Sequence, residues 1–246
     1  MASIAIIGGT GLTRLANLSI LGQETHTTPY GEPSAVLTRG MLAGKEVLFL
    51  PRHGATHTIP PHRVNYRANI SVLKNSGIDK VIAINAVGGI TAQMAPQVLA
   101  VPDQIIDYTW SRAHTFYDQG LAEVVHIDFT QPYCESLRQA ILNAAQQAGV
   151  EVVGAATYAA TQGPRLETTA EINRLERDGC DLVGMTGMPE AALAREAGLC
   201  YASIAVVANW AAGRSEGEIT LQEIEHHLKA GMEKVKRLLA QLIPVL

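Results

Sequence analysis

Short apolar runs alternate with segments of helical periodicity along the whole chain. Several runs are nearly continuous Val, Ile and Ala, which is typical of strands that are covered on both faces. The strands that this pattern predicts are 3–7, 35–38, 46–50, 81–85, 152–157, 182–185 and 201–208.

The helices predicted between these strands have clear ends. Segment 133–148 places Leu137 and Ile141 on one apolar face and stops at Gly149. Segment 171–178 and a last helix, whose apolar positions recur in steps of three and four, both begin with a capping box. The two capping pairs are Thr168 with Glu171 and Thr220 with Glu223.

Strands and helices that alternate without a repeat, linker or low-complexity segment predict one α/β domain over residues 1–246. We expect a central, mostly parallel mixed sheet flanked by helices. The N-terminal run fits a first strand rather than a signal peptide, because no basic residue precedes it and it stops at Gly8. The longest charge-free stretch, 81–102, is interrupted by polar residues and glycines, so we expect no membrane span.

The charge content suggests contacts between copies of the chain. Charged residues make up 17% of the 246 positions, whereas about 25% is usual. A chain with so few charges often covers part of its surface with copies of itself, so we expect a homo-oligomer. The net charge of −4 argues against a nucleic-acid partner.

The three cysteines, Cys134, Cys180 and Cys200, are odd in number and show no paired spacing. This is typical of buried thiols in a reducing compartment. We therefore expect a cytoplasmic protein without a disulfide framework.

A glycine-rich turn follows the first predicted strand. Its glycines allow backbone N–H groups to approach an anion closely, and Thr10 adds a hydroxyl donor. A tight turn without a ligand is the simpler alternative. The spacing does not meet the dinucleotide fingerprint, although a dinucleotide-binding redox or sensory protein stays open as a minor alternative.

Segment 51–63 also follows a predicted strand and carries several cationic side chains. Arg52 and His53 suit a phosphate, because a guanidinium fork and an imidazole N–H complement its oxygens. His53, His57 and His62 could instead hold the metal of a hydrolase, but no HExxH glutamate is present and two prolines prevent the aligning helix. A solvated polar loop is a third possibility.

Three further polar residues stand at the ends of predicted elements, each with a purely structural alternative. Glu167 precedes a helix, whose dipole a carboxylate stabilises. Thr186 can cap the helix that Pro189 opens or donate to an anion, and Asn209 can simply form a turn. Because α/β proteins bind ligands at the carboxyl ends of their strands, the ensemble predicts one site with anion donors and a purine-reading pair. The donors are Thr10, Arg52, His53 and Thr186, and the pair is Glu167 and Asn209.

Four blocks of the chain, GGTGL, RHGATHTIPPHRVNYRANI, ATQGPRLETTAEI and MTGMPEAALAREAGLCYASIAVV, resemble the trimeric purine nucleoside phosphorylases. The methylthioadenosine phosphorylase branch is the most similar, and the resemblance runs from about residue 3 to 242. It implies that inorganic phosphate, as co-substrate, splits a nucleoside into a base and a pentose 1-phosphate. It also implies a homotrimer and no metal or organic cofactor.

Residue by residue, the resemblance implies a phosphate site and a set of substrate contacts. The phosphate residues would be Thr10, Arg52, His53, Asn85, Ala86 and Thr186, with Asn85 in the place of that branch's threonine. The substrate contacts would be Met185 at the ribose, Leu166, His57 and, reaching a neighbouring subunit's pocket, His126.

The base-reading residues depart from the methylthioadenosine branch. That branch has an Asp-Tyr-Asp segment where this chain has Asn209-Trp210-Ala211, and a serine in the place of Glu167. Glu167 and Asn209 are similar to the pair of the 6-oxopurine nucleoside phosphorylases. A carboxylate accepts the N1–H of hypoxanthine but meets a lone pair in adenine, while an amide donates to O6 or N7. Such a mismatch discriminates by on the order of 10⁴–10⁵.

The 5′ end of the expected nucleoside meets apolar residues. The 6-oxopurine enzymes have a histidine before the last helix, whereas this chain has Ile219-Thr220-Leu221, and Leu221 and Ile224 suit a thiomethyl group. We therefore expect 5′-methylthioinosine as substrate, with methylthioadenosine or inosine as alternatives. Asn209 would stabilise charge on the departing purine, Glu167 would hold N1–H, and His53 would help to position the phosphate.

Overall fold

The computed structural model describes residues 3–9, 17–120 and 122–246. In these ranges eleven strands form one sheet, with β2, β3, β4, β1, β5, β10, β9 and β7 in order and β11, β6 and β8 joined beyond the other edge of β5. The strands are β1 (Ile4–Gly8), β2 (Ser19–Glu24), β3 (Leu37–Leu42), β4 (Lys45–Pro51), β5 (Lys80–Gly89), β6 (Leu99–Ala100), β7 (Gln104–Asp107), β8 (Val152–Val153), β9 (Thr157–Ala160), β10 (Leu182–Gly184) and β11 (Cys200–Trp210).

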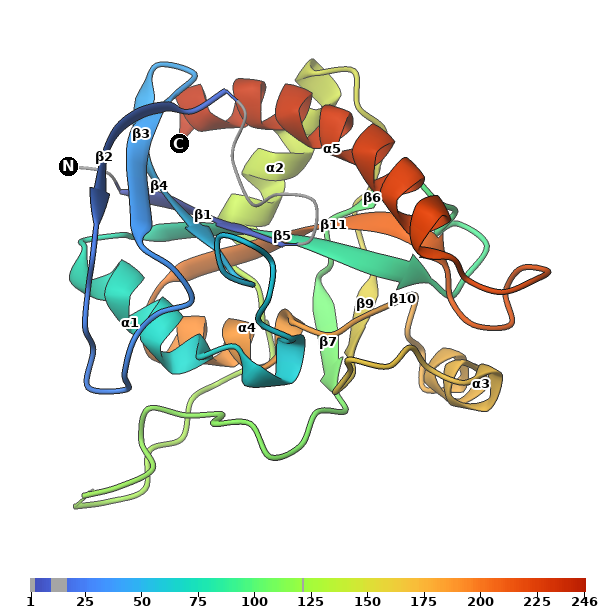
Figure 1. Cartoon of the computed structure of the whole chain (residues 1–246), viewed down its shortest axis with the longest axis horizontal. Coiled ribbons are helices and arrows are strands. Elements are labelled where there is room, and N and C mark those ends of the chain that lie inside the picture. The colour runs from blue at the N-terminus through green and yellow to red at the C-terminus, as the bar shows by residue number, and fades with distance from the viewer. Residues whose placement is uncertain (1–2, 10–16, 121) are drawn as a thin grey trace.

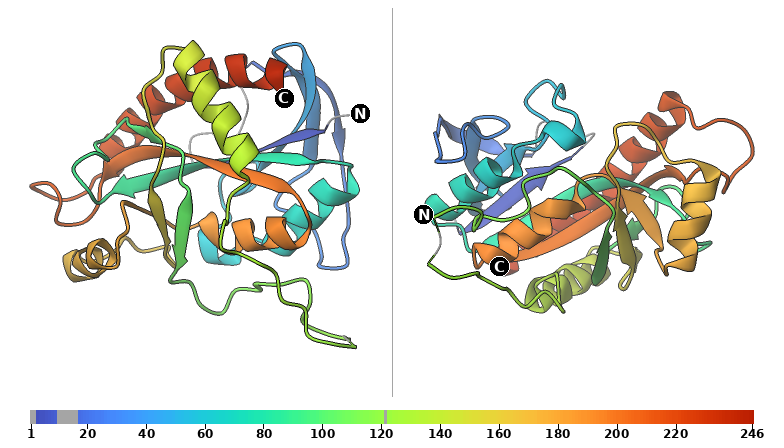
Figure 2. Two further views of the ribbon diagram at one scale, coloured as in Figure 1. Left: turned by 180° about the vertical axis from the view of Figure 1, so that it is seen from behind. Right: turned by 90° about the horizontal axis from the view of Figure 1, so that it is seen from below.

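Helices cover both faces of this sheet (Figures 1 and 2). The helices are α1 (Tyr66–Asn75), α2 (Glu135–Gln147), α3 (Thr169–Arg177), α4 (Gly187–Glu196) and α5 (Leu221–Leu242), with short 3₁₀ turns at Pro61–Arg63 and Ile243–Val245. In Figure 1, α2 and α5 lie above the sheet, α1 and α4 lie below it, and α3 lies beside β10. The expected α/β class with a mixed, mostly parallel sheet is confirmed, since six of the ten strand pairings among the described residues are parallel.

Two of the three apolar cores among the described residues follow from the alternation of side chains along the central strands. In β1, Ala5 and Ile7 pack into the core between the sheet and helices α1 and α4. Ile4 and Ile6 pack into the core between the sheet and helices α2 and α5. Each fully buried isoleucine contributes about 1.5–3 kcal/mol to folding. The near-continuous apolar runs of the sequence are thus strands covered on both faces.

Most predicted elements are present with shifted ends. The predicted strand 152–157 is wrong, because the chain changes neighbours within it: β8 pairs with β6, whereas β9 pairs with β10 and β7. The sequence pattern also missed four elements. They are the largely exposed β2, the two-residue β6, β7 and the polar α1.

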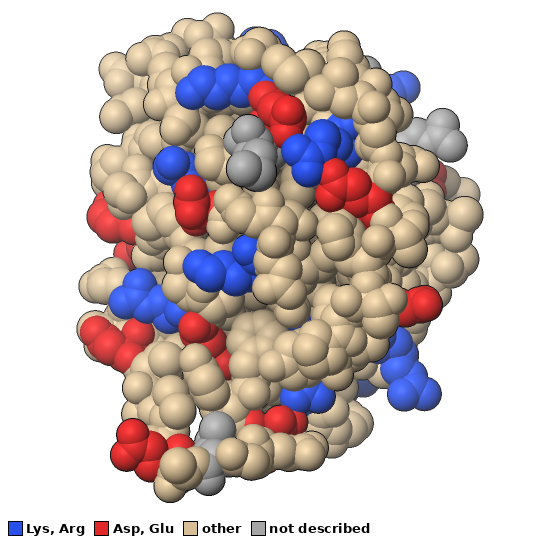
Figure 3. Space-filling view, turned by 90° about the vertical axis from the view of Figure 1, so that its left-hand side faces the viewer, with Lys and Arg blue, Asp and Glu red and all other residues tan. Residues whose placement is uncertain are grey.

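The surface carries scattered charges of both signs. Figure 3 shows Lys and Arg interspersed with Asp and Glu on one face, over a largely uncharged background. Among the described residues, no helix combines the length and the apolar character that a membrane crossing requires.

The expectation of free thiols is wrong for two of the three cysteines. Cys134, the N-cap residue of α2, forms a disulfide with Cys200 at the start of β11, and only Cys180 is free. The two residues are 66 positions apart in the chain. They carry no local spacing signal, because the fold alone brings α2 against β11.

This pairing predicts the number of reactive thiols. Protein purified in air and unfolded in denaturant should expose one thiol per chain, from Cys180, and three after reduction. A Cys180→Ser variant should expose none before reduction. Three reactive thiols in the untreated protein, measured with a chromogenic disulfide reagent, would contradict the pairing.

Candidate active site

The site is created by two strands that approach each other along one edge of β5. β11 occupies the opposite edge over its whole length, from Lys80 to Gly89. On the shared edge, β1 runs parallel to β5 and ends opposite Ala83, while β10 runs antiparallel and begins opposite Gly89. The carboxyl ends of β1 and β10 therefore face each other across residues 84–87. Both strands turn away there, and the turns leave room for a ligand.

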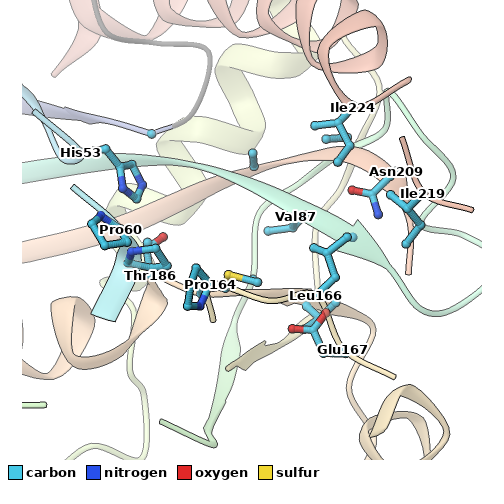
Figure 4. A pocket seen from close by; sticks show the side chains of 18 of the residues that line it. His53, Pro60, Val87, Pro164, Leu166, Glu167, Thr186, Asn209, Ile219 and Ile224 are labelled. Carbon is cyan, nitrogen blue, oxygen red and sulfur yellow. The ribbon is translucent and has the colours of Figure 1, made fainter. Parts of the chain in front are cut away.

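A cavity of about 410 Å³ opens at this point, within the roughly 300–1,000 Å³ usual for small-molecule sites. Figure 4 shows that it is elongated, with His53, Pro60 and Thr186 near one end and Glu167, Asn209 and Ile224 near the other. Seven separate runs of the chain, from Gly9 to Ile224, thus contribute to one cavity. All the predicted segments whose residues are described, apart from that of His126, meet here.

Arg52, at the end of β4, is fully buried and held by Glu190 of α4. Nε and Nη2 donate to the two carboxylate oxygens at 2.6 and 2.7 Å, and Nη1 donates to the Ile84 carbonyl at 3.0 Å. Burial opposes the charge of Arg52, but the attraction of Glu190 overcomes this and raises the pKa of Arg52. Three of the five N–H groups of the guanidinium are thereby used, and two stay available to a ligand oxygen.

His53 differs from the expectation in the role of its ring. Nδ1 lies 2.8 Å from the Ile59 carbonyl, and because a carbonyl only accepts, Nδ1 carries the hydrogen. Burial, and secondarily the charge of Arg52, lowers the pKa of His53 to about 4. The ring is therefore neutral at pH 7, and Nε2 is its acceptor. It can accept from a protonated phosphate oxygen rather than donate an N–H.

A buried chain of hydrogen bonds ends at Thr186. Ser203 donates to Oδ1 of Asn85, and Nδ2 of Asn85 donates to the Thr186 hydroxyl oxygen, both at 2.8 Å. Since that oxygen is already an acceptor, the Thr186 hydrogen is available to an anion in the cavity. Thr186 is the N-cap residue of α4 but makes no side-chain capping bond.

The predicted phosphate residues divide into those in the cavity wall and those behind it. Arg52, His53, Ala86 and Thr186 line the cavity, whereas Asn85 is buried behind Thr186. Asn85, predicted as a phosphate residue, therefore does not line the cavity itself and contacts it through Thr186. Thr10 lies outside the described residues.

Glu167 and Asn209 are positioned by specific local features. Thr161 donates to one carboxylate oxygen of Glu167 at 2.6 Å, which fixes the group and leaves the other oxygen as an acceptor. A bulge in β11 between Val207 and Asn209 redirects Asn209 toward the cavity. Gly88 on β5 lies beside its amide, since a Cβ there would be in ordinary van der Waals contact with Nδ2 of Asn209, at 3.5 Å.

The apolar wall and the outlying candidates complete the site. Met185, Leu166, Ile219, Leu221 and Ile224 line the cavity, and His57 lies at its exposed side. His126 is exposed in the segment 108–134 and does not line the cavity of its own chain. No group of three His, Cys, Asp or Glu side chains in the described ranges could hold a metal ion.

Glu190 is the site residue that the sequence did not reveal. It is completely buried, it pairs with Arg52, and it accepts from the Tyr201 hydroxyl at 2.8 Å. In the sequence it is an acidic residue in the first turn of a helix, where a solvent-exposed carboxylate is common. Only the distant partner Arg52, 138 positions away, distinguishes it.

The lowered pKa of His53 predicts a loss of stability in acid. The unfolded histidine takes up a proton below pH 6.5 and the folded one only near pH 4, so stability is complete above pH 6.5 and falls as the pH approaches 4. The size of the effect is about 3 kcal/mol. Chemical denaturation between pH 6.5 and 4 should show that the free energy of unfolding falls more steeply for wild type than for His53→Gln. A stability difference between the two proteins that is constant with pH would contradict this prediction. The same loss of pH dependence in a variant of an exposed histidine, His226→Gln, would also contradict it.

Comparisons with known proteins agree with this arrangement. Residues 3–244 match the model of the Phosphorylase superfamily. A probable S-methyl-5′-thioinosine phosphorylase of Xanthomonas campestris pv. campestris is 53% identical over 241 residues, covering 98% of this chain and 96% of that protein. A 6-oxopurine nucleoside phosphorylase of Pyrococcus furiosus is 43% identical over 251 residues, covering 100% and 94%.

The fold is also that of a solved structure. Methylthioadenosine phosphorylase from Schistosoma mansoni in complex with adenine superposes with a TM-score of 0.95 at 32% identity, covering all of this chain and 92% of the other. The matched family model and the relatives extend over nearly the whole chain, and this chain therefore belongs to the phosphorylase superfamily.

Proposed function

We propose that the protein catalyses phosphorolysis of 5′-methylthioinosine to hypoxanthine and 5-methylthioribose 1-phosphate. The observation that carries this proposal is that the two ends of the cavity differ, with anion donors near one end and the Glu167–Asn209 pair near the other. A nucleoside between them would present its C1′ to a phosphate and its base to the pair. The names of the relatives, which include both thioinosine and 6-oxopurine phosphorylases, support the same choice.

Recognition of the base would depend on the fixed carboxylate of Glu167. Because Thr161 already donates to one oxygen, the other is oriented to accept the N1–H of hypoxanthine. Adenine would place a lone pair against it. Nδ2 of Asn209 donates one hydrogen to the Trp210 carbonyl at 2.7 Å, and its second hydrogen can reach O6 or N7 of the purine.

The chemistry would be a displacement at C1′. The bond from C1′ to N9 breaks, its electron pair goes to the purine, and a phosphate oxygen forms the new bond to C1′. The proton of the hydrogen phosphate ends on the departing purine, which gives neutral hypoxanthine. Arg52 and Thr186 donate to the phosphate, and Nε2 of His53 accepts from its protonated oxygen. The rate acceleration would come from positioning of the phosphate nucleophile and from stabilisation of the charge on the purine by Asn209. Phosphate is the co-substrate, and no metal or cofactor is required.

The 5′ substituent would occupy the apolar part of the cavity. The side chains of Ile219, Leu221 and Ile224 offer no hydrogen-bond partner to a 5′-hydroxyl. A methylthio group needs no hydrogen-bond partner and can pack against these apolar side chains. A base and a sugar phosphate are both reusable inside the cell, so we place the reaction in cytoplasmic purine salvage.

The substrate proposal predicts a clear order of rates. With phosphate present, methylthioinosine should be cleaved faster than inosine, and methylthioadenosine should be on the order of 10⁴ slower, because its base mismatches Glu167. The measurement is kcat/KM for the three nucleosides by chromatographic detection of the free base. Equal rates for methylthioadenosine and methylthioinosine would overturn the role of Glu167.

The mechanism predicts a large effect at Asn209. Asn209→Ala should lower kcat/KM by about 10²–10³, the loss typical of one donor to a developing negative charge. Asn143→Ala, an exposed asparagine on α2, is the matched control and should leave kcat/KM unchanged. An unchanged rate for Asn209→Ala would remove this residue from the mechanism.

We further propose that the enzyme is a homotrimer in which His126 enters a neighbouring subunit's cavity. The segment around it exposes large apolar side chains, with Trp110 and Val124 accessible at 65% and 73%. Such exposure favours a partner surface. A protein with few charged residues would cover this segment in an oligomer.

This assembly predicts complementation between two defective variants. His126→Ala should raise KM while sedimentation still reports a trimer. Subunits of His126→Ala reassembled with Asn209→Ala should regain activity, because some sites combine an intact Asn209 with an intact neighbouring His126. No gain after reassembly, or a monomer in sedimentation, would contradict the shared site.

A further inference from the structure

Arg112 lies in the connection between β7 and α2, outside every motif recognised in the sequence, and it makes a dense set of hydrogen bonds beside the cavity. Its Nη1 donates to the carbonyls of Met185 and Met188 at 2.8 and 2.6 Å. Its Nη2 donates to the carbonyls of Thr161 and Gln162 at 3.2 and 2.8 Å. Nε donates to Oε1 of Gln162 at 3.1 Å. All five N–H groups of the guanidinium are thereby used.

These acceptors belong to two segments that leave adjacent strands. Thr161 and Gln162 directly follow β9, while Met185 follows β10, and the two strands pair in parallel. Met188 has extended dihedral angles, φ −118° and ψ 142°, that interrupt the start of α4. A single planar, rigid donor group therefore spans the ends of both strands. A lysine, with three donors on one atom, cannot reproduce this geometry.

Each clamped segment carries residues of the proposed site. The 161–167 segment supplies Glu167, whose carboxylate is held by the Thr161 hydroxyl, and the 185–188 segment supplies Met185 and Thr186. A third connection runs through Tyr66: its hydroxyl lies 3.4 Å from Nη1 of Arg112 and shares one of the two Nη1 hydrogens, and that hydroxyl donates to the Pro61 carbonyl at 2.9 Å. Pro61 also lines the cavity.

The acceptors around Arg112 are all neutral. Among the described residues no carboxylate lies within ion-pair distance of it, in contrast to Arg52 and Glu190. The bonding capacity of Arg112 is thus spent on fixing backbone carbonyls rather than on neutralising an acid. This is the arrangement expected of a group that holds loops in place.

We propose that Arg112 is a positioning residue that sets the spacing between the base-reading wall at Glu167 and the anion-binding wall at Thr186. The inference rests on the proposed function for what those walls bind. The inference goes beyond the proposed function because it assigns the separation of the two walls to one side chain that touches neither base nor phosphate. A displacement of about 1 Å between reacting groups lowers rates by about 10²-fold.

The experiment compares Arg112→Lys and Arg112→Ala with Arg67→Ala. Arg67 pairs with Asp118 in the same long connection but touches no cavity segment, so its removal is a matched control for loosening that connection. We expect kcat/KM for methylthioinosine to fall by about 10²-fold in both Arg112 variants. Arg67→Ala should stay close to wild type, as for most exposed ion pairs. Added guanidinium should restore part of the activity of Arg112→Ala and of no other variant.

Hydrogen exchange provides a readout without substrate. In Arg112→Lys, amides in 161–167 and 185–188 should exchange faster, while amides of the β1 and β5 core should keep their protection. Global loss of protection without rescue by guanidinium, or unchanged exchange together with unchanged kcat/KM, would overturn the inference. Failure of the wild type to cleave methylthioinosine would instead refute the proposed function, and the exchange result would still decide the role of Arg112.

Discussion

The approach of β1 and β10 along one edge of β5 is the constraint on which the rest of the site depends. A strand edge offers a continuous row of N–H and C=O groups, and here two strands of opposite direction share it. Both must end where they meet, so two carboxyl ends and their turns converge on the middle of β5. The nearby polar groups have to be paired or be offered to a ligand. A cavity lined by the ends of these strands follows directly.

Buried polar and charged groups near this junction are held by partners within the protein rather than by solvent. Arg52 would be costly to bury alone, and Glu190 offsets that cost with two hydrogen bonds and the opposite charge. The chain from Ser203 through Asn85 fixes the Thr186 hydroxyl, and the Ile59 carbonyl fixes the His53 ring. Because these groups are oriented before a ligand arrives, little reorganisation is needed at the moment of reaction.

Local patterns were sufficient to predict much of this molecule. The apolar runs predicted the central strands, and polar residues at strand ends, such as Thr186 and Asn209, predicted where the cavity lies. The contacts that organise the site could not be predicted, because they join distant residues. Glu190 pairs with a residue 138 positions away, and Cys134 with one 66 positions away. Arg112 stands in a long irregular connection without a motif, and the hydrogen on His53 depends on a carbonyl that only the fold places beside it.

The most direct test of this account is a crystal structure of the protein with hypoxanthine and phosphate bound together. We expect N1 of the base to lie within hydrogen-bond distance of the Glu167 carboxylate and the phosphate to contact the Thr186 hydroxyl and the Arg52 guanidinium. A base bound beside Arg52, or a phosphate bound beside Glu167, would contradict the assigned polarity of the cavity and the substrate derived from it.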